Sequence, residues 1–243
     1  AALVYRPLSD TTLRLSGGRA FRPPTVYELF RTWTSTAGIT YAGNPGLKPE
    51  KSLSWDIGGE TTLWKTTFLR ATYFENYIED MIYRMDTTAT RKDNINIGKA
   101  EVKGVELEGK HRFDCGLTLF ANYTYTNAKV KENDRNPNTE GKRLTMVPAE
   151  MFNMGFNMDR GPFSVSATGR YVSKRYSDDL NRDRINGVLF SYDPFFTANA
   201  KVLYRWNSHL SLSLSVDNVF DRDYFSSYQA PGRKWYGELT IKF

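Results

Sequence analysis

The chain ends in WYGELTIKF, residues 235–243, in which two kinds of side chain alternate strictly. The odd positions hold apolar residues or glycine, among them Trp235, Leu239 and Phe243, and the even positions include Glu238 and Lys242. Successive side chains of a β-strand point to opposite faces, whereas helical patterns repeat every 3.6 residues. This stretch therefore predicts a strand with one apolar face.

The same period of two recurs upstream, most clearly at 210–217 and 163–171, and no amphipathic helical pattern competes with it. It predicts an all-β, antiparallel chain of eleven strands. The predicted strands are 1–6, 11–21, 52–63, 67–83, 95–113, 117–128, 144–159, 163–174, 194–206, 209–221 and 234–243.

The predicted connections alternate between short and long along the whole chain. Antiparallel neighbours then place every long loop at one end of the sheet, which is typical of an up-and-down transmembrane barrel with short periplasmic turns. Several predicted strands are also longer than the roughly 5–6 residues usual in soluble domains. The short connections are 7–10, 64–66, 114–116, 160–162 and 207–208, and the long ones are 22–51, 84–94, 129–143, 175–193 and 222–233.

The composition fits this architecture. The chain has 243 residues, 40% apolar and 14% aromatic, which suits one domain and excludes a disordered chain. A mean hydropathy of −0.54 and the lack of a long apolar run argue against a membrane-spanning helix, but strands that face lipid on one side keep the mean low. The single Cys115 forms no disulfide within the chain.

Charged residues recur on one face of a predicted strand. Glu106, Glu108 and Arg112 lie two or four positions apart, opposite apolar residues such as Leu107. A charge on the lipid face costs roughly 2–4 kcal/mol at mid-bilayer, so these side chains are expected to face the lumen. Arg170 is assigned to the lumen for the same reason.

The long loops carry much of the basic excess behind the net charge of +6. Two interpretations stay open: solvated loops in contact with anionic headgroups, or electrostatic capture of an anionic ligand at the barrel mouth. Nucleic acid is not predicted as a partner, because the pattern offers neither a basic groove nor a known module. The basic candidates for ligand contact are Arg143, Arg175, Arg182 and Arg233.

Aromatic residues form a second group of candidates. The longest loop, 22–51, exceeds the length of an ordinary connector, and such loops are usually functional or disordered. Ligand contact and packing of the loop on itself are equally open as reasons for its aromatic residues. The aromatic ligand-binding candidates are Tyr27, Phe30, Trp33 and Tyr41, with Tyr228 in the last long loop.

No catalytic or metal-binding pattern is present. The sequence has no GxSxG, HExxH or P-loop motif, and its only histidines, His111 and His209, lie at the predicted short-turn end. The acidic stretch 178–183 lacks EF-hand spacing. We therefore expect no enzymatic activity, no cofactor and no resident metal.

Four stretches of this chain resemble the C-terminal half of a TonB-dependent outer-membrane receptor of the siderophore or cobalamin type. Any one of them is modest evidence, but all four follow one another in the order found in that family. They are GRAFRPP at 18–24 followed by YEL at 27–29, NPGLKPE at 44–50, VKGVELE at 102–108, and VDNVFD at 216–221 followed by PGR at 231–233.

The resemblance implies a 22-stranded barrel filled by a plug domain, which imports a scarce ligand with energy from TonB. Residues 1–243 would be about eleven of those strands, a fragment without plug or TonB box. Its partners would be the plug, the other barrel half, the TonB complex acting through the plug, outer-membrane lipid and the barrel-assembly machinery. Glu106, Glu108, Arg112 and Arg170 would contact the plug.

The resemblance also implies a cellular location and a ligand class. The protein would lie in the outer membrane of a Gram-negative bacterium with its C-terminus in the periplasm, and Trp235 and Phe243 resemble the signal read during barrel assembly. Haem receptors of this family carry a histidine in the segment that corresponds to 25–43, where this chain has none. A ferric siderophore is expected, with cobalamin or haem as alternatives and a passive porin as a different class.

Overall fold

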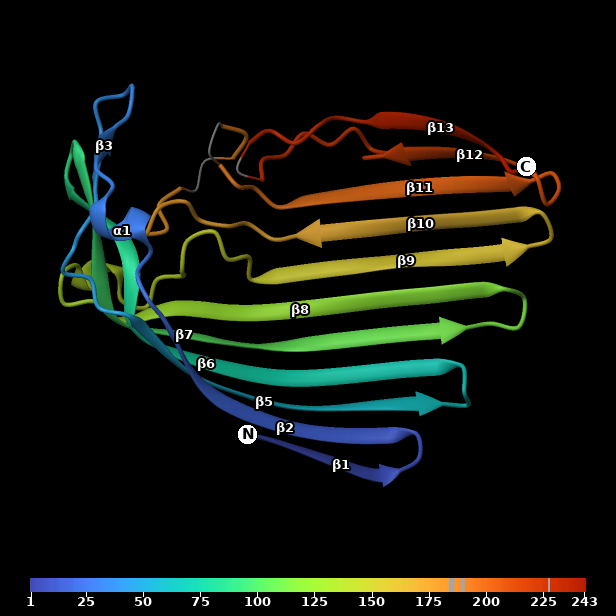
Figure 1. Ribbon diagram of the computed structural model, residues 1–243, viewed down its shortest axis with the longest axis horizontal. Coiled ribbons are helices and arrows are strands. Elements are labelled where there is room, and N and C mark those ends of the chain that lie inside the picture. Colours follow the sequence, from blue (N-terminus) through green and yellow to red (C-terminus); the bar gives the residue numbers. More distant parts are fainter. Residues whose placement is uncertain (184–185, 189–190, 227) are drawn as a thin grey trace.

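The computed structural model describes residues 1–243 except 184–185, 189–190 and 227, and it forms one long antiparallel sheet (Figure 1). Eleven strands follow one another as neighbours in chain order, apart from two short strands inside a loop. The eleven are β1 (Ala2–Leu8), β2 (Thr11–Arg22), β5 (Glu50–Leu63), β6 (Thr67–Thr88), β7 (Arg91–Arg112), β8 (Leu117–Glu132), β9 (Glu150–Arg160), β10 (Phe163–Val172), β11 (Phe195–Arg205), β12 (Leu210–Asp217) and β13 (Lys234–Ile241). The predicted all-β, antiparallel fold is confirmed.

The sheet is open: among the described strands, β1 and β13 each have one neighbour. The C-terminus and every short turn except that between β6 and β7 lie at one end of the strands, and the long connections lie at the other (Figure 1). We call these the turn end and the loop end. No helix within the described residues is long and apolar enough to span a membrane.

Strand register separates two faces of the sheet. In β2, β5 and β7, apolar residues at odd positions pair with one another, so Leu13, Ile57 and Leu107 share one face with their cross-strand neighbours. Each of these three side chains is about half exposed. Charged residues at even positions, such as Glu60 and Glu108, lie on the opposite face. The structure thus confirms the predicted division into an apolar and a polar face.

One predicted long loop is wrong. Residues 84–94 do not form a loop, because β6 continues to Thr88 and β7 starts at Arg91, which leaves a two-residue turn between the longest strands. The strict alternation of short and long connections therefore fails here. The segment is polar and lacks clear alternation, yet it is paired throughout except for an irregularity between Asp86 and Thr88.

The predicted strand 144–159 is also corrected, since β9 begins only at Glu150 and 144–149 belongs to the preceding loop. Leu144 is buried there in a cluster with Ile97 and Ala128, and Val147 packs against the same cluster. The apolar residues before Glu150 thus cover the β6–β8 segment from a loop. Alternation alone does not separate that role from a strand.

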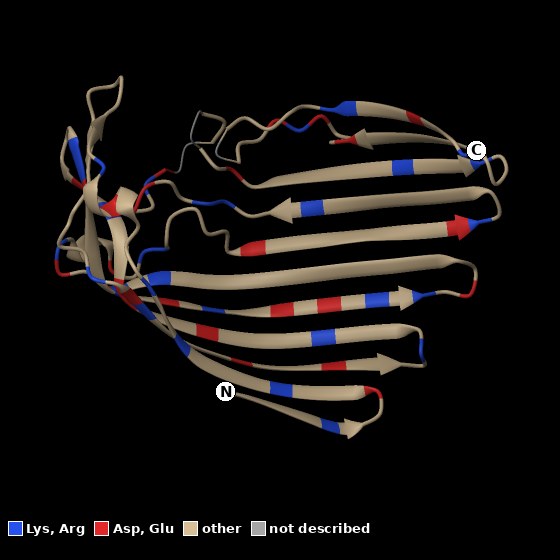
Figure 2. Ribbon diagram, viewed as in Figure 1, with Lys and Arg blue, Asp and Glu red and all other residues tan. Residues whose placement is uncertain are grey.

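The longest connection has structure of its own. It contains helix α1 (Val26–Phe30) and a small hairpin of β3 (Trp33–Thr34) and β4 (Thr40–Ala42), none of which was predicted. Strand β4 pairs in parallel with the start of β7, at Arg91 to Asp93. A 3-10 turn, η1 (Pro137–Thr139), lies in the connection between β8 and β9. The loop end is therefore folded, and Figure 2 shows charges of both signs there.

Candidate functional site

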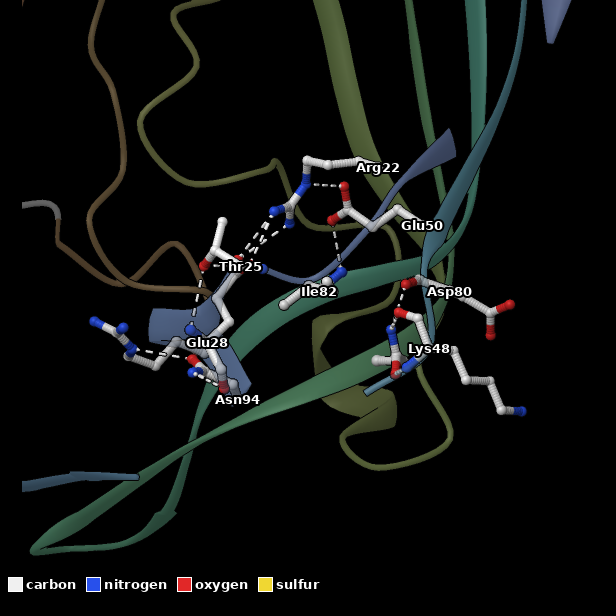
Figure 3. Close-up of polar contacts among 10 residues, drawn as sticks. Arg22, Thr25, Glu28, Lys48, Glu50, Asp80, Ile82 and Asn94 are labelled. Atoms are coloured by element: carbon white, nitrogen blue, oxygen red, sulfur yellow. Dashed lines mark hydrogen bonds and ion pairs between the residues drawn. The ribbon is translucent and has the colours of Figure 1, made fainter. Parts of the chain in front are cut away.

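Arg22, the last residue of β2, organises the start of the longest loop (Figure 3). Its Nε donates to Glu50 at 2.6 Å, and its Nη1 lies 3.0 Å from a carboxylate oxygen of Glu28. Glu50 also accepts a hydrogen bond from the backbone N–H of Ile82 at 2.7 Å. One guanidinium thus joins the two ends of the 22–51 segment, and Glu50 links them to β6. We call Arg22, Glu28 and Glu50 the Arg22 network.

The helix that supplies Glu28 begins with a capping box. The Thr25 hydroxyl accepts from the backbone N–H of Glu28 at 3.2 Å, and the Glu28 carboxylate accepts from the backbone N–H of Thr25 at 2.7 Å. This exchange satisfies two backbone donors that a helix start leaves open. Burial alone would raise the pKa of Glu28, but hydrogen bonds from Arg22 and Thr25 hold it below its usual range.

Two asparagines of β7 hold the rest of the segment. Asn94 is 4% exposed, and its side-chain amide donates to the Glu28 carbonyl at 3.1 Å. Asn96 both accepts from and donates to the backbone of Lys48, at 2.8 and 3.0 Å. The same Asn96 amide reaches the Asp80 carbonyl at 2.6 Å. The longest loop is thereby fixed to the sheet at several points.

Three of the predicted aromatic candidates come together. Trp33 and Tyr41 stack with ring centroids 4.5 Å apart and planes 8° from parallel, and the Trp33 indole donates to the Tyr27 hydroxyl at 3.0 Å. The guanidinium of Arg31 lies 4.9 Å from the Tyr27 ring centre, and that of Arg84 lies 5.2 Å from the Tyr41 ring centre. We call Tyr27, Trp33 and Tyr41 the aromatic group.

The other two aromatic candidates stand apart from it. Phe30 is 65% exposed and Tyr228 is 87% exposed. No ring contact involves either of them within the described residues. Their role as ligand contacts stays a prediction.

Each of the predicted arginines makes contacts with other residues at the loop end. Arg175 donates to the Phe225 carbonyl at 2.8 Å and lies against the Tyr192 ring, and burial lowers its pKa. Arg182 pairs with Asp178 at 3.0 Å. The remaining two are also bound: Arg143 donates to the Thr126 carbonyl and through its backbone to Asn181, and Arg233 lies 3.8 Å from Asp221. Their use in ligand capture stays a prediction.

A polar row crosses the polar face of the sheet nearer the turn end. Arg70 lies at its centre, 2.8 Å from Glu60 on one side and 3.3 Å from Glu108 on the other. The predicted lumen residues Glu108 and Arg170 both belong to this row. Neighbour by neighbour it runs Thr12, Glu60, Arg70, Glu108, Asn122, Asn153 and Arg170.

The other two predicted lumen residues share the face but not the row. Glu106 pairs with Thr72 and Thr124 one step toward the loop end, and Arg112 is the last residue of β7.

The predicted assembly residues lie on the final strand and beyond it: Trp235 is on β13 and 62% exposed, and Phe243 follows the end of the strand.

Sequence reasoning missed Glu50, Arg70 and Asn94. The contact between Arg70 and Glu60 cannot be recognised without the register of β5 and β6, because the two residues are ten positions apart in sequence. One signal was available: Thr25 and Glu28 have the spacing of a capping box, which marks a helix start. Within the described residues, no group of three or more His, Cys, Asp or Glu side chains is placed to hold a metal ion.

Comparison with known proteins identifies the family. Residues 1–219 match the family model described as TonB dependent receptor-like, beta-barrel. The chain belongs to the TonB-dependent receptor β-barrel family. This membership agrees with the open antiparallel sheet and its two distinct ends.

Individual members of the TonB-dependent receptor family are similar over the whole chain but extend well beyond it. The vitamin B12 transporter BtuB of Photobacterium profundum is 24% identical over 100% of this chain and 37% of its own length. A mutant ferric enterobactin receptor, PfeA of Pseudomonas aeruginosa, solved with enterobactin, is 25% identical with a TM-score of 0.77 over 100% of this chain and 40% of its own. The chain thus spans about two fifths of these relatives.

A third likeness shows the fold alone. The ferric yersiniabactin uptake receptor FyuA of Yersinia pestis is 20% identical, with a TM-score of 0.73 over 100% of this chain and 36% of that one. These named relatives are transporters and receptors, and none is named as an enzyme. The sequence resemblance to TonB-dependent receptors is thereby confirmed, and the ligand is left to proposal.

Proposed function

We propose that this chain is the C-terminal half of the barrel of an outer-membrane receptor that binds a ferric siderophore and imports it with energy from TonB. The observation that carries the ligand class is the aromatic group, flanked by two exposed guanidinium groups, Arg31 and Arg84. Flat aromatic surfaces beside cations suit an anionic ligand that presents planar rings. Iron-binding catecholates have that chemistry.

The second candidate is cobalamin. It is favoured by one observation, the similarity to a vitamin B12 transporter along the entire chain. A haem receptor is less supported, because residues 25–43 contain no histidine to ligate the iron. A passive porin would need the loop end to leave an open channel.

The loop end and the polar row have separate roles in this proposal. The loops and the apices of a plug bind the ligand and close over it, and a pull from TonB then rearranges the plug. The polar row, with Glu108 and Arg170, faces that plug across the lumen. Glu106 and Arg112 extend the same surface, while the remaining barrel strands and outer-membrane lipid complete the surroundings.

The proposal also places the chain in the envelope of a Gram-negative bacterium. The turn end and the C-terminus lie in the periplasm, and the loop end faces outward. Trp235 and Phe243, on the last strand and after it, are read by the barrel-assembly machinery. The protein needs no cofactor, since the imported iron is cargo, and it is not an enzyme.

The test uses the full-length receptor in detergent, with tryptophan fluorescence titrated against ferric catecholates, ferric hydroxamates, haem and cobalamin. Saturable quenching by a ferric siderophore is expected. Selective binding of cobalamin would show that the ligand is cobalamin and not a ferric siderophore. No binding by any of the four, together with open-channel conductance in a planar bilayer, would overturn the receptor assignment in favour of a porin.

A matched pair of variants tests the carrying observation. Trp33→Ala removes the stacked indole and is expected to weaken siderophore binding about tenfold, since one buried aromatic contact is worth about 1–2 kcal/mol. Trp64→Ala removes an indole that is 80% exposed at the turn end and is expected to leave affinity unchanged. Equal affinities for the two variants would contradict the role of the aromatic group.

The arginines of the loop end are tested separately. Arg182→Glu reverses a charge whose side chain is 71% exposed, and it is expected to weaken binding at low salt more than at high salt. Arg175→Glu tests the same idea at a half-buried position. If affinity and its salt dependence are unchanged in both variants, electrostatic capture by these loops is wrong.

A further inference from the structure

The tips of β6 and β7 form a hairpin at the loop end that carries side chains next to the aromatic group. Pairing of β7 with β8 stops at Lys99, and β4 occupies the free edge of β7 beyond it, at Arg91 to Asp93. Arg84 of β6 and Asn94 of β7 lie directly opposite one another in this hairpin. We call residues 82–96 the tip hairpin.

Asn94 connects the tip hairpin to the longest loop through both ends of its amide. Its Nδ2 donates to the Glu28 carbonyl at 3.1 Å, and its Oδ1 accepts from the Arg84 Nε at 3.3 Å. Figure 3 shows Asn94 beside Glu28 of α1. A carboxylate could accept from Arg84 but could not donate to a carbonyl, and an apolar side chain could do neither. An uncharged amide is therefore the group that satisfies both partners at this position, which is 4% exposed.

Asn94 thus orients the Arg84 guanidinium without neutralising it. Its Nε is bonded to the amide, and the guanidinium lies over the Tyr41 ring with Cζ 5.2 Å from the ring centre. Arg84 is exposed, and its two Nη groups make no hydrogen bond or ion pair with any described residue. Arg22 shows the opposite arrangement, because its two partners are carboxylates. The free edge of Arg84 keeps its positive charge for a partner outside the described chain.

The carboxylates that approach this face of the tip hairpin are bound to other cations. Asp86, two positions further along β6, lies 2.7 Å from Lys92. The two carboxylates of the Arg22 network, which approach from the longest loop and from β5, are bound to Arg22 at 3.0 and 2.6 Å. The face itself, formed by positions 82, 84, 86, 92, 94 and 96, holds two cations and one carboxylate. Its excess positive charge is therefore located at Arg84.

A free guanidinium edge beside a stacked aromatic pair restricts what can bind there. The edge is a fork of N–H donors that matches two neighbouring anionic oxygens. Tyr41, over which Arg84 lies, stacks on Trp33 with ring centroids 4.5 Å apart and adds a flat apolar surface. A catecholate combines two adjacent anionic oxygens with a planar ring. A hydroxamate also chelates iron through two oxygens, but it has no aromatic ring and its tris-complex with ferric iron is neutral.

We propose that Asn94 is a positioning residue that presents Arg84 to a catecholate group of the ferric siderophore, and that this pair selects anionic ferric complexes over neutral ones. In this arrangement Arg84 contacts the ligand, and Asn94 acts through Arg84 without touching the ligand. The inference rests on the proposed function and narrows it to one class of siderophore, with the residues that select that class.

The experiment titrates ferric enterobactin, a tris-catecholate, into the full-length receptor in detergent at low and high salt, with tryptophan fluorescence as the signal. Arg84→Gln is expected to weaken binding at low salt on the order of tenfold and to reduce its salt dependence, because a charge-assisted contact is lost. Arg84→Lys keeps the charge without the fork and should lose less. The matched control Arg91→Gln changes the net charge equally, but Arg91 is already paired with Asp93 at 2.9 Å, so a loss of less than about twofold is expected.

Asn94→Ala tests whether Asn94 acts through Arg84. The change also frees α1 from the tip hairpin, so weaker binding alone does not decide the question. If Asn94 positions Arg84, Asn94→Ala reduces the salt dependence in the otherwise unchanged receptor and has no further effect on it in the Arg84→Gln background. Asn94→Asp retains an acceptor for Arg84 but neutralises its charge, so the salt dependence should fall there too. A purely structural Asn94 would weaken binding by the same factor at both salt concentrations, and that result would overturn the proposal.

Ferrichrome, a neutral tris-hydroxamate, separates this inference from the proposed function. The Arg84→Gln receptor is expected to lose affinity for ferric enterobactin only, so its preference shifts toward ferrichrome. Equal losses of ferric enterobactin affinity in Arg84→Gln and Arg91→Gln, or binding of ferrichrome without ferric enterobactin by the unchanged receptor, would overturn the inference and leave siderophore import in place. Binding of neither complex would overturn the proposed function, and this inference would fail with it.

Discussion

The connections at the two ends of the sheet are stabilised by different interactions. At the turn end, connections of a few residues are shaped by local backbone, with positive φ at Trp64 and Lys65 in one turn and at Gly161 in another. At the loop end, the connections are held by side chains that reach across tens of residues, such as Arg22 to Glu50 and Asn94 to the Glu28 carbonyl. Sequence changes at the turn end should therefore act locally, whereas changes at the loop end should release whole segments.

The largest expected effect is loss of the Arg22 guanidinium. Arg22→Met leaves Glu28 and Glu50 without their shared cation, and both carboxylates are at most 20% exposed. We expect the free energy of opening the 22–50 segment to fall by about 2 kcal/mol, less than for a fully buried pair because Arg22 itself is partly solvated. Hydrogen exchange of the full-length receptor in detergent measures it.

The control for that variant is Arg14→Met, on the same strand. Arg14 makes no ion pair or side-chain hydrogen bond with the described residues, so exchange in the 22–50 segment should not change. If both variants expose the segment equally, the Arg22 network does not hold it.

A somewhat smaller effect is expected for Asn94→Ala. The change leaves the Glu28 carbonyl with one partner fewer and removes the acceptor of the Arg84 guanidinium, at 3.3 Å. A cost of about 1–2 kcal/mol to local opening of α1 and β4 follows from a lost buried hydrogen bond. Asn157→Ala, at an exposed site on β9, should leave exchange unaltered. Protection of α1 that survives Asn94→Ala would contradict this account.

The same contrast explains what the sequence predicts well. The sheet was predictable because alternation is a local signal, and the short turns fall where Gly161–Pro162 and similar pairs interrupt it. Strand ends agree to within a few residues for β10 and β11. The failure at 84–94 has the opposite cause: those residues pair only because a partner strand and β4 lie beside them, and no local pattern reports that.

The candidate site was predictable only in part for the same reason. Loop aromatics can be picked out by composition, and three of them do meet, but which three depends on the β3–β4 hairpin. Arg70 is a further case, because its two carboxylate partners come from strands on either side of it. A single sequence contains the residues of such a contact but does not specify which of them lie opposite one another on neighbouring strands.

At the turn end, Gly161→Ala should cost about 1 kcal/mol. Gly161 has φ +57° and nothing within 4 Å of the position of an added Cβ, so the cost is purely that of a left-handed backbone. Gly237→Ala, which also meets nothing within 4 Å but lacks a positive φ, should be neutral. Thermal denaturation of the full-length receptor compares them. Loss of siderophore binding in Gly161→Ala would break the distinction between the two ends.

The smallest effect expected is on pH dependence at the loop end. Burial, with repulsion from Asp178 and Asp86, raises the pKa of Asp179 above its ordinary value of 3.8. A raised carboxyl pKa means that the folded loop holds the proton more tightly than the open one does. The contribution of Asp179 to the stability of the folded loop is therefore complete below pH 3.8 and declines as pH rises through the raised value.

Asp178 acts in the opposite sense, because its hydrogen bond with Arg182 lowers its pKa, so its contribution is present above the ordinary value of 3.8 and is lost as pH falls through the lowered value. Hydrogen exchange around Asp179, corrected for intrinsic rates and measured upward from about pH 5, where Asp178 is ionised in both the folded and the open loop, thus isolates Asp179. Protection should decrease with pH in the unchanged receptor and become flat in Asp179→Asn. A slope that persists in Asp179→Asn would assign the titration to another group, and protection that increases with pH would reverse the sign argued here.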